Sequence, residues 1–135
     1  MDPLFLDTAY LIALEAVDDQ NHPAAEADWK RLRKALPPLV TTSFVFNEVV
    51  TFFNSRNWHA KAVELGHMLL ESPSVELVEV DTALFRRGWE YFQERPDKRF
   101  SLTDCISFLV MTDRGIAQAL SFDHHFVQAG FVTLP

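Results

Sequence analysis

The sequence predicts an α/β fold with three layers, in which helices cover both faces of a central, mainly parallel sheet. Short apolar runs that suit strands alternate along the chain with one or two longer stretches that suit helices. Strands separated by helices in this way pair in parallel within an α/β sheet. The 135 residues include 12 Phe, enough for a well-filled core, and no linker, repeat or low-complexity segment interrupts them. We therefore expect one domain over residues 1–135.

The N-terminal part is predicted to form a strand and two helices. The apolar run "PLFLD" (3–7) indicates a short buried strand that ends in an acid, and "TAYLIALEAV" (8–17) indicates the helix after it. The segment 24–36 shows helical spacing of its apolar residues, at Ala25, Trp29, Leu32 and Leu36. Two consecutive prolines end this helix before a brief strand at 39–42.

The middle of the chain is predicted to contain two strongly apolar helices and a strand. The first helix covers 43–55, with Ser43 as its N-cap, and the second covers 59–72 and is closed by a proline. A strand follows at 75–80.

The C-terminal part returns to strands after two more helices. Asp81 is predicted to cap a helix over 82–95, and a polar loop then leads to a helix that begins after Ser101. Ser101 followed by Asp104 is the signature of a capping box. The remaining elements are a strand, a turn of helix and a final strand, at 117–122, 124–130 and 131–135.

Composition and charge limit the possible classes of protein. The single Cys105 excludes an intrachain disulfide and is compatible with a reducing cytosol. No apolar run approaches the roughly 18 residues of a membrane span, and the N-terminus lacks the basic region of a secretory signal. We therefore expect a cytoplasmic protein that does not associate with membranes. The net charge of −7 argues against a protein that coats nucleic acid, although bound cations would allow an enzyme to act on it.

Four acids stand where the sequence predicts little access to water. Asp7 and Asp123 each follow a predicted strand, and open α/β sheets bind ligands outside the carboxyl ends of their strands. Glu48 projects from an apolar helix face, and Asp104 opens a helix that is apolar nearly all round. Each acid has a purely structural alternative. The three Asp could be helix or turn caps, and Glu48 could pair with a buried Arg.

A shared cause explains these acids better than four separate coincidences. Carboxylates held close together repel one another, and some must take up protons unless a positive charge compensates them. Mg²⁺ and Mn²⁺ prefer oxygen ligands and would remove this conflict. The sequence therefore predicts a divalent cation site.

The segments that carry these acids also resemble a known family. "LFLDTAYLIAL", "TTSFVFNEVV", "RFSLTDCISFLVM" and "ALSFDHHF" look like the acidic motifs of the PIN domain, and in particular of VapC-type toxins from prokaryotic toxin–antitoxin pairs. The resemblance implies a PIN-like fold and cleavage of RNA phosphodiester bonds with one or two Mg²⁺ or Mn²⁺ ions. Its acidic quartet, which would bind the metal and catalyse the reaction, falls on Asp7, Glu48, Asp104 and Asp123. Polar positions beside the site fall on Thr8 and Ser101.

The resemblance also implies protein partners. These are a cognate antitoxin, whose tail commonly covers the acidic site, and a second copy of the chain in a homodimer. The apolar helices at 43–55 and 59–72 could supply such surfaces, or could simply belong to the core.

Basic residues near the third acid are candidates for contacts to RNA phosphates. They lie on the helix and in the loop before it: Arg86, Arg87, Arg95, Lys98 and Arg99. A solvated loop is the equal alternative. We assign His124 and His125 to the surface or to packing, with a contact to the metal ligands or the substrate as the alternative.

Two other functions remain open from the sequence. A PIN-like binding module could dock RNA or a protein partner without catalysis, and it would bind no Mn²⁺ and cut no RNA. A metal-dependent phosphohydrolase of another α/β family is the third possibility. It is disfavoured because "LDTAY" lacks the second Asp of the aspartyl-phosphate nucleophile motif.

Overall fold

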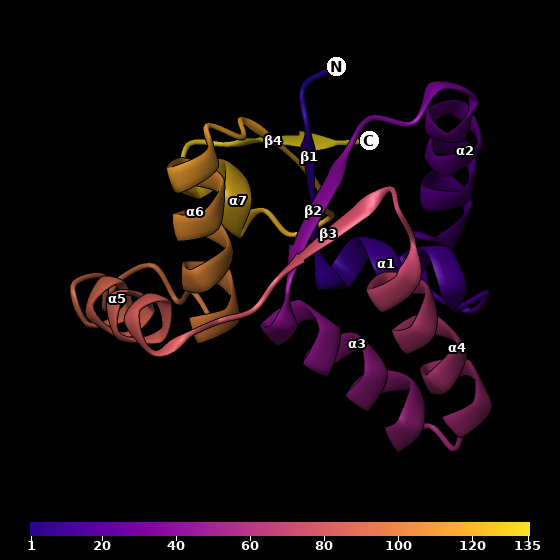
Figure 1. The fold of residues 1–135 in the computed structure, drawn as a ribbon, viewed down its shortest axis with the longest axis horizontal. Coiled ribbons are helices and arrows are strands. Elements are labelled where there is room, and N and C mark those ends of the chain that lie inside the picture. Colours follow the sequence, from indigo (N-terminus) through magenta and orange to yellow (C-terminus); the bar gives the residue numbers. More distant parts are fainter.

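The computed structural model describes residues 1–135 and contains a five-stranded sheet in which all neighbouring strands run parallel (Figure 1). The strands are β1 (Leu4–Leu6), β2 (Leu39–Thr42), β3 (Val75–Val78), β4 (Gln118–Leu120) and β5 (Val132–Leu134). Their order across the sheet is β3-β2-β1-β4-β5. The predicted parallel sheet is confirmed, and four of its strands are slightly shorter than their apolar segments.

Seven α-helices connect the strands. They are α1 (Thr8–Glu15), α2 (His22–Leu32), α3 (Ser43–Ser55), α4 (His59–Glu71), α5 (Thr82–Gln93), α6 (Leu102–Arg114) and α7 (His125–Gln128). The helix predicted at 24–36 begins earlier, because a proline in its first turn suits the helical φ, and it ends in a 3₁₀ turn over Arg33–Ala35. None of these helices is both long and apolar enough to span a membrane.

One predicted helix cap is wrong. The side chain of Thr42, not Ser43, caps α3 by accepting a hydrogen bond from the backbone N–H three residues further on. Ser43 Oγ instead accepts a hydrogen bond from the backbone N–H of Val80 at 2.9 Å, which ties α3 to the segment after β3. The cap predicted at Asp81 is confirmed at the start of α5.

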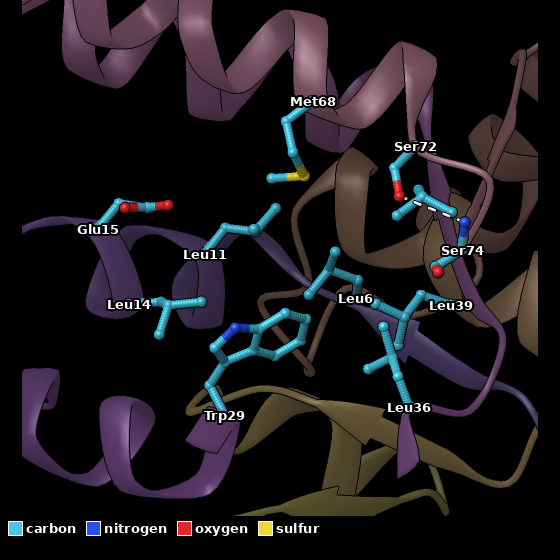
Figure 2. Close-up of a pocket in the computed structure, with 11 residues that line it drawn as sticks. Leu6, Leu11, Leu14, Glu15, Trp29, Leu36, Leu39, Met68, Ser72 and Ser74 are labelled. Carbon is cyan, nitrogen blue, oxygen red and sulfur yellow. Dashed lines mark hydrogen bonds between the residues drawn. The ribbon is translucent and has the colours of Figure 1, made fainter. Parts of the chain in front are cut away.

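Helices cover both faces of the sheet, as predicted. On one face, Phe5 of β1 packs against Phe126 of α7, whose ring also contacts Phe108 of α6. On the other face, an apolar cavity of about 300 Å³ lies between the sheet and helices α1, α2 and α4. Figure 2 shows the side chains that converge on this cavity, among them Leu6, Leu11, Trp29 and Met68. None of the four predicted site acids lines it.

Gly88 allows α5 to pack closely against α6. A Cβ atom at position 88 would overlap Cδ1 of Ile106, a fully buried side chain whose displacement would disturb the surrounding core. We expect Gly88→Ala to lower the free energy of unfolding by about 1–2 kcal/mol, because the cost of overpacking exceeds the gain of about 1 kcal/mol in helix propensity. Urea denaturation measures this change.

A second substitution tests the cause of that loss. Ile106→Val removes the methyl group that the added Cβ atom of Gly88→Ala would meet, so the double variant should lose less stability than the two single variants added together. Strict additivity would contradict a steric origin.

Candidate metal centre

Two of the predicted acids meet at the carboxyl edge of the sheet. Asp7 directly follows β1, and Asp123 follows β4 after two further residues. These strands are parallel neighbours, with Leu6 opposite Leu120. Because β2 and β4 lie on opposite sides of β1, this edge is the topological switch point at which α/β proteins bind ligands.

Asp7 is buried and does not act as a cap. It stands at the N-cap position of α1, but its side chain makes no capping hydrogen bond. Ser121 Oγ instead donates to Asp7 Oδ2 at 2.7 Å. Burial raises the pKa of Asp7 to about 7, against the lowering effect of the Ser121 hydrogen bond. The charges of Asp104 and Asp123 also raise this pKa, so both carboxylates lie near Asp7.

Asp104 is both a cap and a member of the acidic cluster. Its Oδ2 accepts a hydrogen bond from the Ser101 N–H, while Ser101 Oγ accepts one from the Asp104 N–H. This completes the predicted capping box. The pKa of Asp104 is raised, chiefly by burial and further by the charge of Asp123. The capping box therefore holds a buried carboxylate at the start of α6 and points it toward the cluster.

His125 contacts both carboxylates, which agrees with the alternative given for it from the sequence and not with the preferred assignment to surface or packing. Its Nδ1 lies 3.0 Å from Asp104 Oδ2 and 3.3 Å from Asp123 Oδ1. One ligand atom from each of these three residues falls within 4.8 Å of the other two. Asp123 Oδ1 also accepts a hydrogen bond from the His125 N–H. Asp123 is therefore a turn cap, as its structural alternative predicted, and also a member of the cluster. The sequence signal for this contact was the position of Asp123, two residues before His125.

Glu48 contacts the residue that follows Asp7 in the chain. Thr8 Oγ1 donates a hydrogen bond to Glu48 Oε1 at 2.8 Å, and Thr8 directly follows Asp7 in the chain. No Arg or Lys forms an ion pair with Glu48, so the alternative of a buried ion pair is wrong. The structure therefore connects Glu48 to Asp7 through Thr8, and does not place it in the group formed by Asp104, Asp123 and His125.

The remaining predicted residues occupy different surroundings. Thr8 orients Glu48, and Ser101 uses its hydroxyl in the capping box. Arg99 is exposed, has a positive φ of 59°, and stands two residues before the cap of α6. Ser121 was missed by the sequence reasoning. It is fully buried and links Asp7 to Asp123, because its hydroxyl donates to Asp7 and accepts from the Asp123 N–H.

The contact between Thr8 and Glu48 predicts a measurable effect on metal binding. Thr8→Val keeps the shape of the side chain and removes the hydroxyl that orients the Glu48 carboxylate. Loss of such a supporting hydrogen bond typically costs 10–100-fold in metal affinity or activity. We expect Mn²⁺ affinity by calorimetry to fall by about tenfold or more in Thr8→Val and by much less in Thr8→Ser. Equal losses in both variants would contradict a role for the hydroxyl.

The fold and the cluster together define a class of protein. A parallel sheet between two layers of helices, with carboxylates from β1, α6 and the end of β4 gathered at its switch point, is a PIN-like domain. The sequence model of the PIN domain family matches residues 4–132, and the chain belongs to this family.

The sequence and the structure of this chain are both similar to those of one characterised nuclease. The 23S rRNA-specific endonuclease VapC20 of Mycobacterium tuberculosis is 36% identical to this chain over 130 residues, covering 96% of this chain and 95% of that protein. The crystal structure of that VapC20, described as a sarcin–ricin loop cleaving toxin, matches with a TM-score of 0.84 and 34% identity and covers 96% of both chains.

A more distant structure shares the fold. FitAcB from Neisseria gonorrhoeae matches with a TM-score of 0.65 at 16% identity, covering 98% of this chain and 96% of that one.

Membership of the PIN family excludes the phosphohydrolase of another α/β family that the sequence left open.

Proposed function

We propose that this protein is a divalent-metal-dependent endoribonuclease and the toxin of a toxin–antitoxin pair. The observation that carries the proposal is the gathering of Asp7, Asp104 and Asp123 at the sheet's switch point in a PIN chain, with Glu48 hydrogen-bonded to the residue after Asp7. Similarity to a 23S rRNA-specific endonuclease supports ribosomal RNA, and its sarcin–ricin loop in particular, as the substrate class. The complete acidic quartet favours this function over a non-catalytic binding module.

The residues at the site fit a divalent cation. Asp7 is buried with one side-chain hydrogen bond to Ser121, and two further carboxylates raise its pKa by their charge. A cation offsets this repulsion and takes the oxygen ligands that Mg²⁺ and Mn²⁺ prefer. When bound, it supplies a Lewis acid that lowers the pKa of a water nucleophile and offsets charge on the phosphate.

Each acid has a defined task in the proposal. Asp7 and Asp104 hold one or two cations directly, and Asp123 does so directly or through water. Glu48 binds metal or accepts a hydrogen bond from the attacking water, and the Thr8 hydroxyl fixes its orientation. Hydrolysis in this way leaves 5′-phosphate and 3′-hydroxyl ends.

The basic residues divide into paired and free groups. Arg87 donates two hydrogen bonds to Asp113, and the Arg95 guanidinium lies over the Tyr91 ring, 3.4 Å from its centroid. Both side chains are therefore engaged in contacts within the protein and are less available to bind RNA. Arg86, Lys98 and Arg99 form no ion pair and are the stronger candidates for contacts to RNA phosphates.

Two protein partners belong to the proposal. The chain is the toxin partner of an antitoxin that covers the acidic site, and it forms a homodimer through its helical face. Exposed apolar side chains on α4, among them Val63 and Leu70, support a protein contact there. Light scattering of the isolated chain tests the dimer, and co-purification with the product of an adjacent gene tests the antitoxin.

Cleavage of ribosomal RNA by the pure protein tests the main proposal. We expect cuts in 23S rRNA with Mg²⁺ or Mn²⁺, none with EDTA, and 5′-phosphate ends at the cut. The absence of both metal-dependent cleavage and calorimetric Mn²⁺ binding would support the binding module instead. Cleavage that persists unchanged in Asp7→Asn and Asp104→Asn would indicate a contaminating nuclease.

A further inference from the structure

His125 places a nitrogen atom where a bound cation would find its ligands. The Nδ1 atom lies 3.0 Å from Asp104 Oδ2 and 3.3 Å from Asp123 Oδ1. Two neighbouring ligand atoms of an octahedral ion with bonds of about 2.1 Å lie about 3 Å apart. The two distances from Nδ1 are therefore close to the spacing of neighbouring ligands around one ion, and one ligand atom of each of the three residues lies within 4.8 Å of the others.

The imidazole ring is held in this position by its surroundings. Its edge-to-face contact with Phe100 has a centroid distance of 5.4 Å, and Phe100 immediately precedes the cap of α6. The backbone N–H of His125 donates to Asp123 Oδ1, which fixes the start of α7. The side chain is only 20% exposed, whereas that of the neighbouring His124 is 76% exposed. His125 is thus largely buried at the cluster, whereas His124 is largely exposed and its Nδ1 lies 3.9 Å from Asp123 Oδ1.

The type of ligand atom determines which ion a site prefers. Mg²⁺ favours oxygen ligands and dehydrates reluctantly, whereas imidazole nitrogen suits first-row transition ions and binds them more tightly along the series from Mn²⁺ to Cu²⁺. A site built only from carboxylates therefore has little preference for transition ions over Mg²⁺, whereas one imidazole ligand adds such a preference.

We propose that His125 Nδ1 is a direct metal ligand together with Asp104 and Asp123, and that it makes this site select Mn²⁺ or Co²⁺ over Mg²⁺. The inference rests on the proposed metal-dependent function and specifies its cation. His125 thus becomes a residue that determines metal specificity.

Electron paramagnetic resonance of bound Mn²⁺ gives the most direct test. A coordinated imidazole produces a ¹⁴N coupling in the electron spin-echo signal of Mn²⁺. We expect this coupling in the wild-type protein and in His124→Asn, the matched control on the adjacent exposed His. We expect it to disappear in His125→Asp, which replaces the nitrogen ligand with an oxygen ligand.

Calorimetry supplies an independent measure of the same preference. The ratio of Mn²⁺ to Mg²⁺ affinity should fall by about tenfold or more in His125→Asp and remain unchanged in His124→Asn. Circular dichroism confirms that the variants are folded, and the spin-echo result on the wild-type protein does not depend on any variant.

The outcomes separate this inference from the proposed function. Mn²⁺ binding without a ¹⁴N coupling, or with an unchanged affinity ratio in His125→Asp, would overturn the role of His125 and leave the nuclease proposal standing. Such a result would make the imidazole a hydrogen-bond donor to the carboxylates. The absence of Mn²⁺ binding and of metal-dependent cleavage in the wild-type protein would overturn both.

Discussion

Asp104→Asn is expected to lower the rate of RNA cleavage by about 10³-fold or more while leaving the fold intact. A divalent cation contributes several kcal/mol of transition-state stabilisation, and each 1.4 kcal/mol or so corresponds to a factor of ten in rate. Asn removes the negative charge that holds the cation but keeps one oxygen to accept the Ser101 N–H of the capping box. Single-turnover cleavage of 23S rRNA, with Mn²⁺ calorimetry alongside it, measures the loss.

Asp113→Asn is a matched control for this experiment. Asp113 lies on the same helix, is exposed, and pairs with Arg87 away from the acidic cluster. Its substitution should leave cleavage unchanged and cost about 1 kcal/mol or less of stability. If Asp104→Asn and Asp113→Asn retained equal activity, Asp104 would be a cap without a catalytic role.

Asp7→Asn is expected to stabilise the metal-free protein at about pH 8 while abolishing its activity. Burial raises the pKa of Asp7 from 3.8 to about 7, so the ionised carboxylate destabilises the fold. A difference of roughly three pKa units corresponds to at most about 4 kcal/mol, because one unit equals about 1.4 kcal/mol. Asn carries no charge and still offers an acceptor to Ser121. Thermal unfolding in the presence of EDTA should show a rise in Tm of roughly 5–10 °C.

The sign of this effect depends on pH. The folded pKa of Asp7 lies above the unfolded value of 3.8, so the folded protein holds the proton more tightly. Ionisation of Asp7 therefore costs stability progressively as the pH rises from about 4 to about 7, and the cost is constant above that range. The difference in Tm between Asp7→Asn and the wild type should be small near pH 4 and greatest near pH 8.

The Asp113→Asn variant provides a control in which the change in Tm should have the opposite sign. The hydrogen bonds from Arg87 hold the pKa of Asp113 below its usual value, so removing its charge should lower Tm slightly at neutral pH. Equal Tm values for Asp7→Asn and the wild type at about pH 8, or the same gain at pH 4 as at pH 8, would contradict the cost assigned to the buried charge.

The meeting of Asp7 and Asp123 could be predicted because Asp7 follows β1 directly and Asp123 follows β4 after two residues. In a parallel sheet, all carboxyl ends lie along one edge, so an acid that ends a strand is placed once the strands are assigned. Glu48 and Asp104 could be selected because each interrupts an apolar helix. The role of each acid was harder to predict. Asp104 and Asp123 proved to be caps as well as cluster members, whereas Asp7 makes no capping hydrogen bond.

The sequence by itself determined the order of the elements and the parallel sheet and singled out the four acids, because periodicity and strand ends are properties of neighbouring residues. Only the tertiary structure decided which side chains touch. Ser121 and Asp7 are 114 positions apart, Thr8 and Glu48 are 40 apart, and His125 and Asp104 are 21 apart. Such contacts depend on how α1, α3, α6 and α7 pack on the sheet. The place of His125 beside two carboxylates follows from that packing, because its ring is fixed by Phe100 and by the turn that Asp123 caps.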